Sequence, residues 1–167
     1  PGNIGSFENT KTVVEHCRDN GVAIRIGINS GSLPKDLQEQ IAAGKISRAQ
    51  GLCETAVREA EIFDQLNFDQ YIVSMKSSDV KETIECNQFY AQKFNNPLHL
   101  GVTEAGPLIG GVVKSSIAFS TLLNQNISES PNSGAYIHSS NPYNHQNYIR
   151  WYGKNGAHAI ISPCLPY

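Results

Sequence analysis

The segment VAIRIGINS, residues 22–30, is a β-branched run with the length of a strand. The residues before it, 7–21, have helical apolar spacing and end on a glycine, a common helix stop. After a longer loop, residues 47–67 again carry apolar side chains at helical spacing, with Ser47 in the N-cap position. This order of helix, strand and helix favours a mixed α/β fold.

The same unit recurs further along the chain. Residues 71–78, YIVSMKSS, and residues 98–106, LHLGVTEAG, read as strands, and residues 79–95 and 113–125 read as helices that follow them. Such alternation indicates right-handed βαβ units and a parallel sheet. The side chains expected to face inward from the helices are Val13, Val14, Cys17, Leu52, Ala56, Ala60, Phe63, Leu66, Val80, Ile84, Ala91 and Phe94.

The composition of the chain changes at about Asn124. All six phenylalanines precede this point, five of the seven tyrosines and the only tryptophan follow it, and Glu129 is the only acidic residue beyond it. The remainder is rich in Asn, Ser and Pro and shows no sustained periodicity. We therefore divide the chain into residues 1–123, with a regular α/β pattern, and an atypical tail, residues 124–167.

The whole composition is that of a globular protein, with 167 residues, 40% hydrophobic content and a formal net charge of −2. There is no run of Lys or Arg that would mark a nucleic-acid surface, no membrane-length apolar stretch and no signal peptide. We expect a protein of the bacterial cytoplasm or of a plastid-type compartment, with neither nucleic acid nor membrane as a partner. Because the chain opens on Pro1 without an initiating Met, we expect a fragment or a processed piece.

The four cysteines, Cys17, Cys53, Cys86 and Cys164, are widely and irregularly spaced. None belongs to a C-x-x-C pair, so their spacing indicates neither a disulfide framework nor a local metal site. We expect them to be isolated core or surface thiols.

Polar residues fall in or at the ends of the expected strands: Arg25 and Asn29 on the first, Lys76 on the second and Glu104 on the third. Because ligands of parallel sheets bind at the carboxyl ends of the strands, we expect these four side chains to converge on one rim. Arg and Lys suit a phosphate or diphosphate, and a Glu among them could be a general acid or base.

Each of these residues also has a structural alternative. Arg25 could cover a strand edge with its aliphatic stem, Lys76 could be a solvated loop residue, and Glu104 could cap the next helix. Their recurrence at the same end of successive strands favours the functional interpretation.

Several segments, in order along roughly residues 1–123, resemble a known family. They are PGNIG (1–5), IRIGINSGSL (24–33), FDQYIVSMKSSDV (68–80) and PLHLGVTEAG (97–106), followed by VKSSIAFSTLL (113–123). They are similar to the barrel domain of bacterial 4-hydroxy-3-methylbut-2-enyl diphosphate synthases. The resemblance implies a parallel (β/α)8 TIM barrel, only part of which is present here, with an irregular C-terminal tail.

That family consists of iron–sulfur oxidoreductases of the methylerythritol phosphate route to isoprenoids. The resemblance implies reductive ring opening of 2-C-methyl-D-erythritol 2,4-cyclodiphosphate with loss of water. It also implies a [4Fe–4S] cluster, ferredoxin or flavodoxin as electron donor, and a homodimer for the full-length enzyme.

The resemblance also implies roles for single residues. Arg25 and Lys76 would bind diphosphate oxygens, Asn29 would hydrogen-bond the substrate near the reacting carbons, and Glu104 would protonate the departing hydroxyl. Two further residues that match the family, and are substrate-binding candidates, are Asn3 and His99. The alternatives are a turn role for Asn3 and a hydrogen-bonded place in the barrel interior for His99.

The tail departs from the family pattern. Where the family has a Gly-rich turn and a strand with an Arg and a Ser for the diphosphate, this chain has ISESPNSGAY, residues 127–136. The family's second domain supplies three Cys and a Glu to the cluster, whereas this chain offers Cys164 in SPCLPY. We therefore expect no set of cluster ligands in this chain, because a cubane takes four protein ligands. A reading-frame error and a lineage-specific tail both stay open.

Three functional hypotheses follow. The chain is part of an enzyme active only within a complete polypeptide, or a truncated non-catalytic product without the iron–sulfur domain. The third is another phosphate-handling barrel enzyme, in which Lys76 forms a Schiff base.

Overall fold

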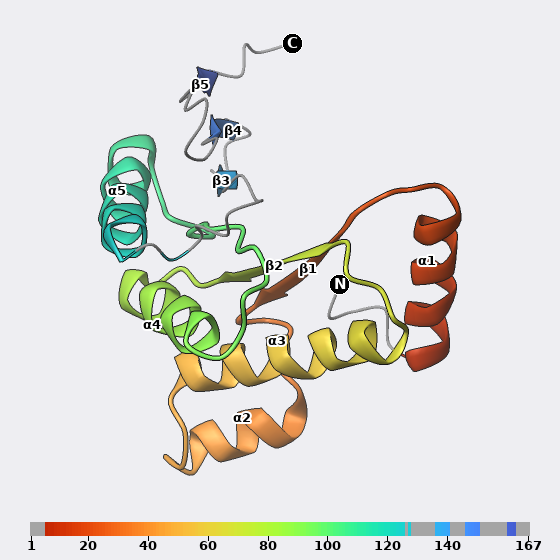
Figure 1. Cartoon of the computed structure of the whole chain (residues 1–167). Helices are drawn as coiled ribbons and strands as arrows, with labels where there is room; N and C mark the ends of the chain where they lie inside the picture. Colours follow the sequence, from red (N-terminus) through yellow and green to blue (C-terminus); the bar gives the residue numbers. More distant parts are fainter. Residues whose placement is uncertain (1–5, 126, 128–135, 141–145, 151–159, 163–167) are drawn as a thin grey trace.

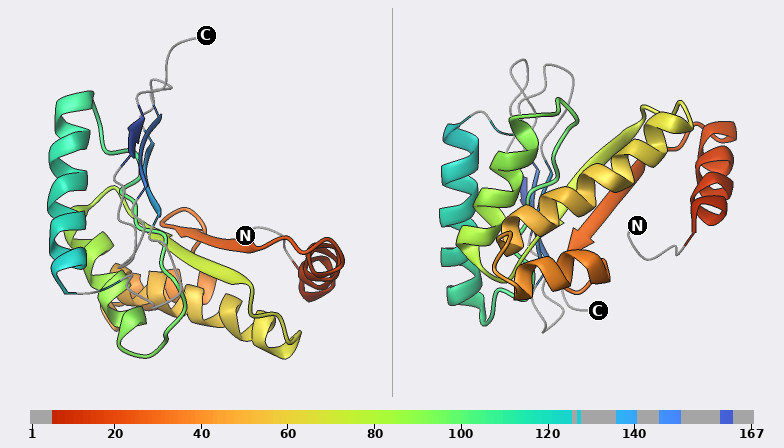
Figure 2. Two further views of the ribbon diagram at one scale, coloured as in Figure 1. Left: turned by 45° about the horizontal axis from the view of Figure 1, so that its top comes forward. Right: turned by 90° about the horizontal axis from the view of Figure 1, so that it is seen from below.

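The computed structural model describes residues 6–125, 127, 136–140, 146–150 and 160–162. In chain order they form α1 (Phe7–Asp19), β1 (Ile24–Asn29), α2 (Lys35–Ala42), α3 (Arg48–Gln65), β2 (Tyr71–Lys76), α4 (Val80–Ala91), α5 (Leu108–Asn124), β3 (Tyr136–Ser140), β4 (Gln146–Arg150) and β5 (Ile160–Ser162). Helices α3 and α4 pack against the β1–β2 pair, and α2 lies outside α3 (Figure 1). Helix α5 lies beside α4 (Figure 2).

Strands β1 and β2 are parallel neighbours, as the alternation of strands and helices predicts. Ile24 lies opposite Tyr71 at one end of the pair, and Asn29 lies opposite Lys76 at the other. Because α3 connects the two strands and packs on them, these elements form one βαβ unit.

The expected third strand is only partly formed. A parallel bridge joins Val73 to Leu98, and the His99 N–H donates to the Val73 carbonyl at 2.8 Å. At the other end the Thr103 N–H donates to the Ser77 carbonyl at 3.1 Å. Residues 98–103 therefore run alongside β2 in parallel, although they do not form a regular strand.

The interruption lies at Met75, in the middle of this stretch. The Met75 carbonyl accepts a hydrogen bond from the Asn87 side-chain amide of α4, at 3.3 Å. No backbone hydrogen bond to residues 98–103 is found at Met75 among the described residues. A side chain from the covering helix thus replaces a rung of the ladder, which local sequence patterns do not reveal.

One face of the β1–β2 pair forms the core with α3. The buried strand residues are Ile24, Ile26, Ile28, Tyr71, Val73 and Met75. Four of the five residues expected to face inward from α3 are buried, namely Leu52, Ala56, Ala60 and Phe63. The Ser47 prediction is also confirmed: its hydroxyl accepts the Gln50 N–H, and the Gln50 side chain accepts the Ser47 N–H.

The predicted faces of two other helices are confirmed in part. In α1, Val14 is buried and Cys17 packs against the core, but Val13 is exposed. The residues predicted to face inward from α4 or just after it, Val80, Ile84, Ala91 and Phe94, are partly buried and pack against the core, whereas the fully buried residues of α4 are Thr83, Cys86, Asn87 and Tyr90. Apolar spacing did not reveal Thr83 and Asn87, because the partners of these polar residues lie on β2 and just after it.

Helix α2 was not predicted, and its residues were assigned to a long loop. It has only eight residues and follows Pro34, and Leu37 is its buried residue. So short a helix provides little periodicity, and its contact with α3 accounts for its stability.

Beyond residue 127, the described parts of the tail are three short strands. β3 pairs with β4, and β4 with β5, all antiparallel. The boundary at residue 124 coincides with the last residue of α5 and stays a prediction. Within the part of the chain that the structure describes, every helix is too short or too polar to cross a membrane.

Candidate functional site

The face of the β1–β2 pair opposite the core carries polar side chains. Register places Gly27 beside Ser74 and Asn29 beside Lys76, and Arg25 lies two residues before Gly27 on the same face. Arg25 and Asn29 are exposed, Lys76 is half-buried and Ser74 is buried. We call Arg25, Asn29, Ser74, Lys76 and His99 the polar face.

Arg25 and Ser74 converge on His99. The Ser74 Oγ lies 3.1 Å from the His99 Nδ1, and the Arg25 Nη1 lies 3.4 Å from the same atom. A guanidinium can only donate and a hydroxyl can donate or accept, so the roles in this contact depend on the tautomer of His99. His99 is 7% exposed, which matches the interior, hydrogen-bonded role given above as the alternative to substrate binding.

Lys76 is the last residue of β2, so its interpretation as a solvated loop residue was wrong. Burial, and secondly the positive charge of Arg25, lowers the pKa of Lys76 from 10.5 to about 8. The positive charges of Lys76 and Arg25 thus lie near each other. A bound anion would offset both the burial and the repulsion that lower the pKa of Lys76.

A stability prediction follows from this pKa. Between pH about 8 and 10.5 the unfolded chain binds a proton at Lys76 that the folded chain lacks, so stability rises with pH across this window. Lys76→Met should therefore raise Tm at neutral pH, and the gain should shrink as the pH rises through the window. Thermal unfolding of the complete polypeptide at several pH values measures this. A matched control is Lys81→Met, because the Lys81 side chain is 82% exposed; equal gains in both variants would contradict the prediction.

Asn29 ends β1, and its backbone and side chain are both held. Its Oδ1 accepts the Gly31 N–H at 2.9 Å, and the Ser32 hydroxyl accepts the Asn29 N–H at 3.0 Å. With the oxygen engaged, the amino group of Asn29 is the part of the side chain that can donate to a ligand.

Glu104 follows the third segment and is exposed. Its φ of +48° lies in the left-handed region, which costs a residue with a Cβ on the order of 1 kcal/mol. The N-cap of α5 is Pro107, which makes no side-chain cap, so Glu104 is not the capping residue of that helix. Thr103, the residue before Glu104, is bonded to Ser77, the residue after Lys76, which places Glu104 and Lys76 at the same end of the sheet.

The predicted convergence on one rim therefore needs one correction. Asn29, Lys76 and Glu104 lie at the carboxyl ends of their segments, but Arg25 is the second residue of β1. Its Cα lies about 13 Å along the strand from that of Asn29. Arg25 reaches the other residues of the polar face through its long side chain, which contacts His99. The remaining predicted site residue, Asn3, lies outside the described residues.

Sequence patterns missed Ser74 and Ser77. Ser74 is two residues before Lys76, so strand alternation would have placed both on one face. Ser77 carries no such signal, because its importance comes from partners on α4 and on residues 98–103.

The described cysteines do not fit an iron–sulfur cluster. Burial raises the pKa of Cys53 to about 11 and that of Cys86 still more, whereas iron binds the thiolate. Cys17 lies on a different helix, and no group of three metal-ligating side chains occurs among the described residues. Cys164 lies outside the described residues, so the predicted lack of cluster ligands stays a prediction.

A cavity of about 320 Å³ lies between α2, α3 and α4 and shares no residue with the polar face. Leu37 and Phe89 form part of its apolar wall, and Arg58 on its rim pairs with Asp36 and Glu54. Arg58 is thus already paired. Lys93 also lines the cavity, but none of the lining residues belongs to the polar face, so we assign the cavity no part in the site.

Comparison with known proteins identifies the family. Residues 1–130 match the family model described as the GcpE TIM-barrel domain. The chain belongs to the GcpE family. The polar face is therefore on the interior side of a TIM barrel, because the surrounding helices cover the other face of the strands.

The curated relatives are named 4-hydroxy-3-methylbut-2-en-1-yl diphosphate synthase (flavodoxin). The protein of Treponema denticola is 51% identical over 144 residues, which cover 76% of this chain and 37% of the relative. Those of Treponema pallidum and Colwellia psychrerythraea are 49% and 46% identical and are covered to 33% and 34% of their length, with 76% and 77% of this chain aligned. The chain thus spans about a third of these GcpE relatives.

Proposed function

We propose that the chain supplies the diphosphate-binding face of a 4-hydroxy-3-methylbut-2-en-1-yl diphosphate synthase. The observation that carries this proposal is the pair of cations, Arg25 and Lys76, on one barrel-interior surface, with the pKa of Lys76 lowered to about 8. A diphosphate between them would offset the desolvation of Lys76 and the repulsion between the two charges. The names and identities of the GcpE relatives support the same assignment.

The substrate in this proposal is 2-C-methyl-D-erythritol 2,4-cyclodiphosphate. Arg25 and Lys76 bind the diphosphate oxygens, and the amino group of Asn29 donates to the substrate beside Lys76, its neighbour in the register. Two electrons enter the substrate, the carbon–oxygen bond of the ring opens, and a hydroxyl leaves as water with a proton from Glu104.

Electron delivery and assembly belong to the complete polypeptide. The names of the relatives specify flavodoxin, and we propose flavodoxin as the donor here, with ferredoxin as the alternative. A [4Fe–4S] cluster held by residues outside this chain, a homodimer and a cytoplasmic location complete the proposal.

Binding of inorganic diphosphate tests the proposed face. We expect affinity for the complete polypeptide to fall as the pH rises through about 8, because Lys76 then loses its charge. Lys76→Ala should weaken binding about ten- to a hundredfold and remove this pH dependence. Titration calorimetry over a pH series measures both effects.

The control for this titration is Lys81→Ala, which removes an exposed lysine of α4. It should bind diphosphate as the parent does. A Lys76→Ala variant with unchanged affinity and the same pH profile would contradict the proposal.

The Schiff-base alternative has one observation in its favour, since a lysine with a pKa of about 8 is readily neutral and nucleophilic. Borohydride treatment in the presence of a carbonyl substrate would trap such an adduct on Lys76. We expect no adduct, because the GcpE relatives are named 4-hydroxy-3-methylbut-2-en-1-yl diphosphate synthase (flavodoxin) and not as aldolase-type enzymes.

A further inference from the structure

Ser77 connects β2, which ends on Lys76, to the segment that ends at Glu104. It follows Lys76 directly, is 1% exposed, and its carbonyl accepts the Thr103 N–H at 3.1 Å. Thr103 in turn precedes Glu104. One backbone hydrogen bond therefore sets the spacing between the ends of the two segments.

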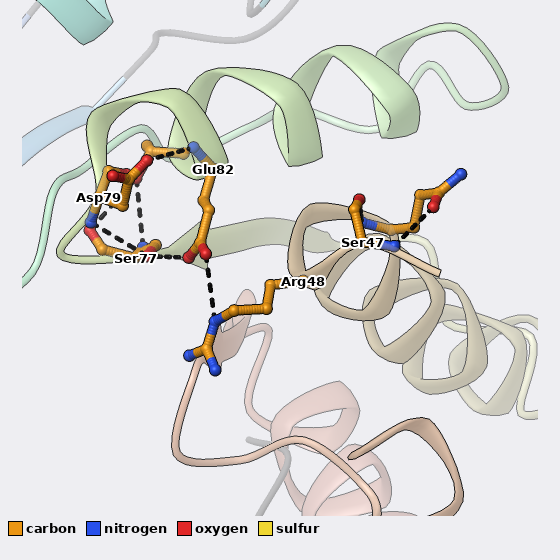
Figure 3. A network of polar contacts seen from close by, with 7 residues as sticks. Ser47, Arg48, Ser77, Asp79 and Glu82 are labelled. Carbon is orange, nitrogen blue, oxygen red and sulfur yellow. Dashed lines mark hydrogen bonds and ion pairs between the residues drawn. The ribbon is translucent and has the colours of Figure 1, made fainter. Parts of the chain in front are cut away.

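Helix α4 holds Ser77 from its first turn (Figure 3). The Ser77 Oγ donates to the Glu82 Oε2 at 2.6 Å and accepts the Asp79 N–H at 3.1 Å. The Ser77 N–H donates to the Thr83 Oγ1 at 3.3 Å. Asp79 also caps α4, because its Oδ1 accepts the Glu82 N–H at 2.8 Å. Backbone and side chain of Ser77 are thus both tied to the start of α4.

Arg48 holds the other oxygen of Glu82. The Arg48 Nε lies 3.1 Å from the Glu82 Oε1, and the Glu82 side chain is only 24% exposed. Arg48 is the first residue of α3, directly after the capping box of Ser47, so this contact joins the starts of two helices (Figure 3). Arg48 itself is 47% exposed, so the contact contributes mainly by fixing the orientation of the Glu82 carboxylate.

Glu104 needs such external support. It is exposed and has a left-handed backbone, so its position depends on the residues before it. The Arg48–Glu82–Ser77 chain ends on the carbonyl that holds Thr103. Arg48, Glu82 and Ser77 all lie outside the polar face. They therefore act on the site only by fixing where Thr103 and Glu104 lie.

We infer that Ser77, Glu82 and Arg48 are positioning residues that set Glu104 relative to Lys76. The inference rests on the proposed function, since it requires Glu104 to be the proton donor. Misplacement of a reacting group by about 1 Å can cost roughly a hundredfold in rate. Loss of the chain of contacts should therefore appear in kcat, while diphosphate affinity, which depends on Arg25 and Lys76, changes little.

The experiment uses the complete polypeptide and two variants. Ser77→Ala removes the hydroxyl but keeps the carbonyl bond to Thr103, and Glu82→Gln keeps size but removes the charge that holds Arg48. Both should lower kcat about ten- to a hundredfold with KM little changed. Glu85→Gln is the matched control: Glu85 lies on the same helix, pairs with Lys81 at 3.7 Å, and should leave kcat unchanged.

A double-mutant cycle separates positioning from simple loss of stability. In a Glu104→Gln background there is no acid to position, so Ser77→Ala should cause no further loss of kcat. If Ser77→Ala lowers kcat by the same factor in both backgrounds, the positioning role is overturned and the proposed function stands. If Glu104→Gln alone keeps a normal kcat, the proton-donor role fails and the inference fails with it.

Discussion

Glu104→Gln should lower kcat about a hundred- to ten-thousand-fold, the usual worth of general acid catalysis, with KM little changed. Glutamine keeps the size and hydrogen-bonding capacity of the side chain but has no proton to transfer. Because Glu104 is exposed at the end of the third segment, the substitution should leave the fold intact. Steady-state kinetics of the complete polypeptide with the cyclodiphosphate and a chemical reductant measures the change.

The backbone of Glu104 provides a second variant. With φ at +48°, Glu104→Gly should stabilise the fold by about 1 kcal/mol while lowering kcat as Glu104→Gln does. Because Glu104→Gln keeps the backbone preference and Glu104→Gly changes it, an equal loss of kcat in both variants would show that the carboxyl group, and not the local backbone, accounts for the loss. If Glu104→Gln kept its kcat and only weakened binding, Glu104 would be a positioning residue.

Phe63→Ala should destabilise the fold by about 3–5 kcal/mol. Phe63 has no exposed surface, and its ring lies 5.1 Å from that of Tyr71 and 6.1 Å from that of Phe68, measured between centroids. The substitution would leave a cavity between α3 and the start of β2. Urea unfolding of the complete polypeptide should show a lower midpoint with an unchanged m-value.

Phe7→Ala serves as the control for this substitution. Phe7 is the first residue of α1 and is 42% exposed, so its loss should cost much less than that of Phe63. Equal costs for the two variants would mean that the core is not centred on the contact between α3 and the β1–β2 pair.

The parts of the fold with strong local signals could be predicted. Helix α3 shows why: its apolar residues repeat over 18 residues, and Ser47 and Gln50 form a complete capping box at its start. Strands β1 and β2 were found because they are short apolar runs between helices. Lys76 and Glu104 were placed at the same end of the sheet because parallel strands share a direction.

The errors occur where a polar side chain has a partner on a distant segment. Asn87 was left out of the buried face of α4, yet it bonds the Met75 carbonyl and interrupts the third strand. Thr83 was also left out, and it is bonded to Ser77. A pattern based on apolar spacing assigns such residues to the surface, because it contains no information about the groups that satisfy them.

The sequence by itself determined the order of α1, β1, α3, β2, α4 and α5, the family, and the residue types available for a diphosphate and a proton. These depend on local periodicity and on motifs that are read along the chain. Only the tertiary structure decided that Arg25 reaches His99, that the pKa of Lys76 falls to about 8, and that Ser77 links Lys76 to Glu104. The physical reason is that register, burial and hydrogen-bond partners arise between segments far apart in the chain, and a shift of one residue in register would exchange the two faces of a strand.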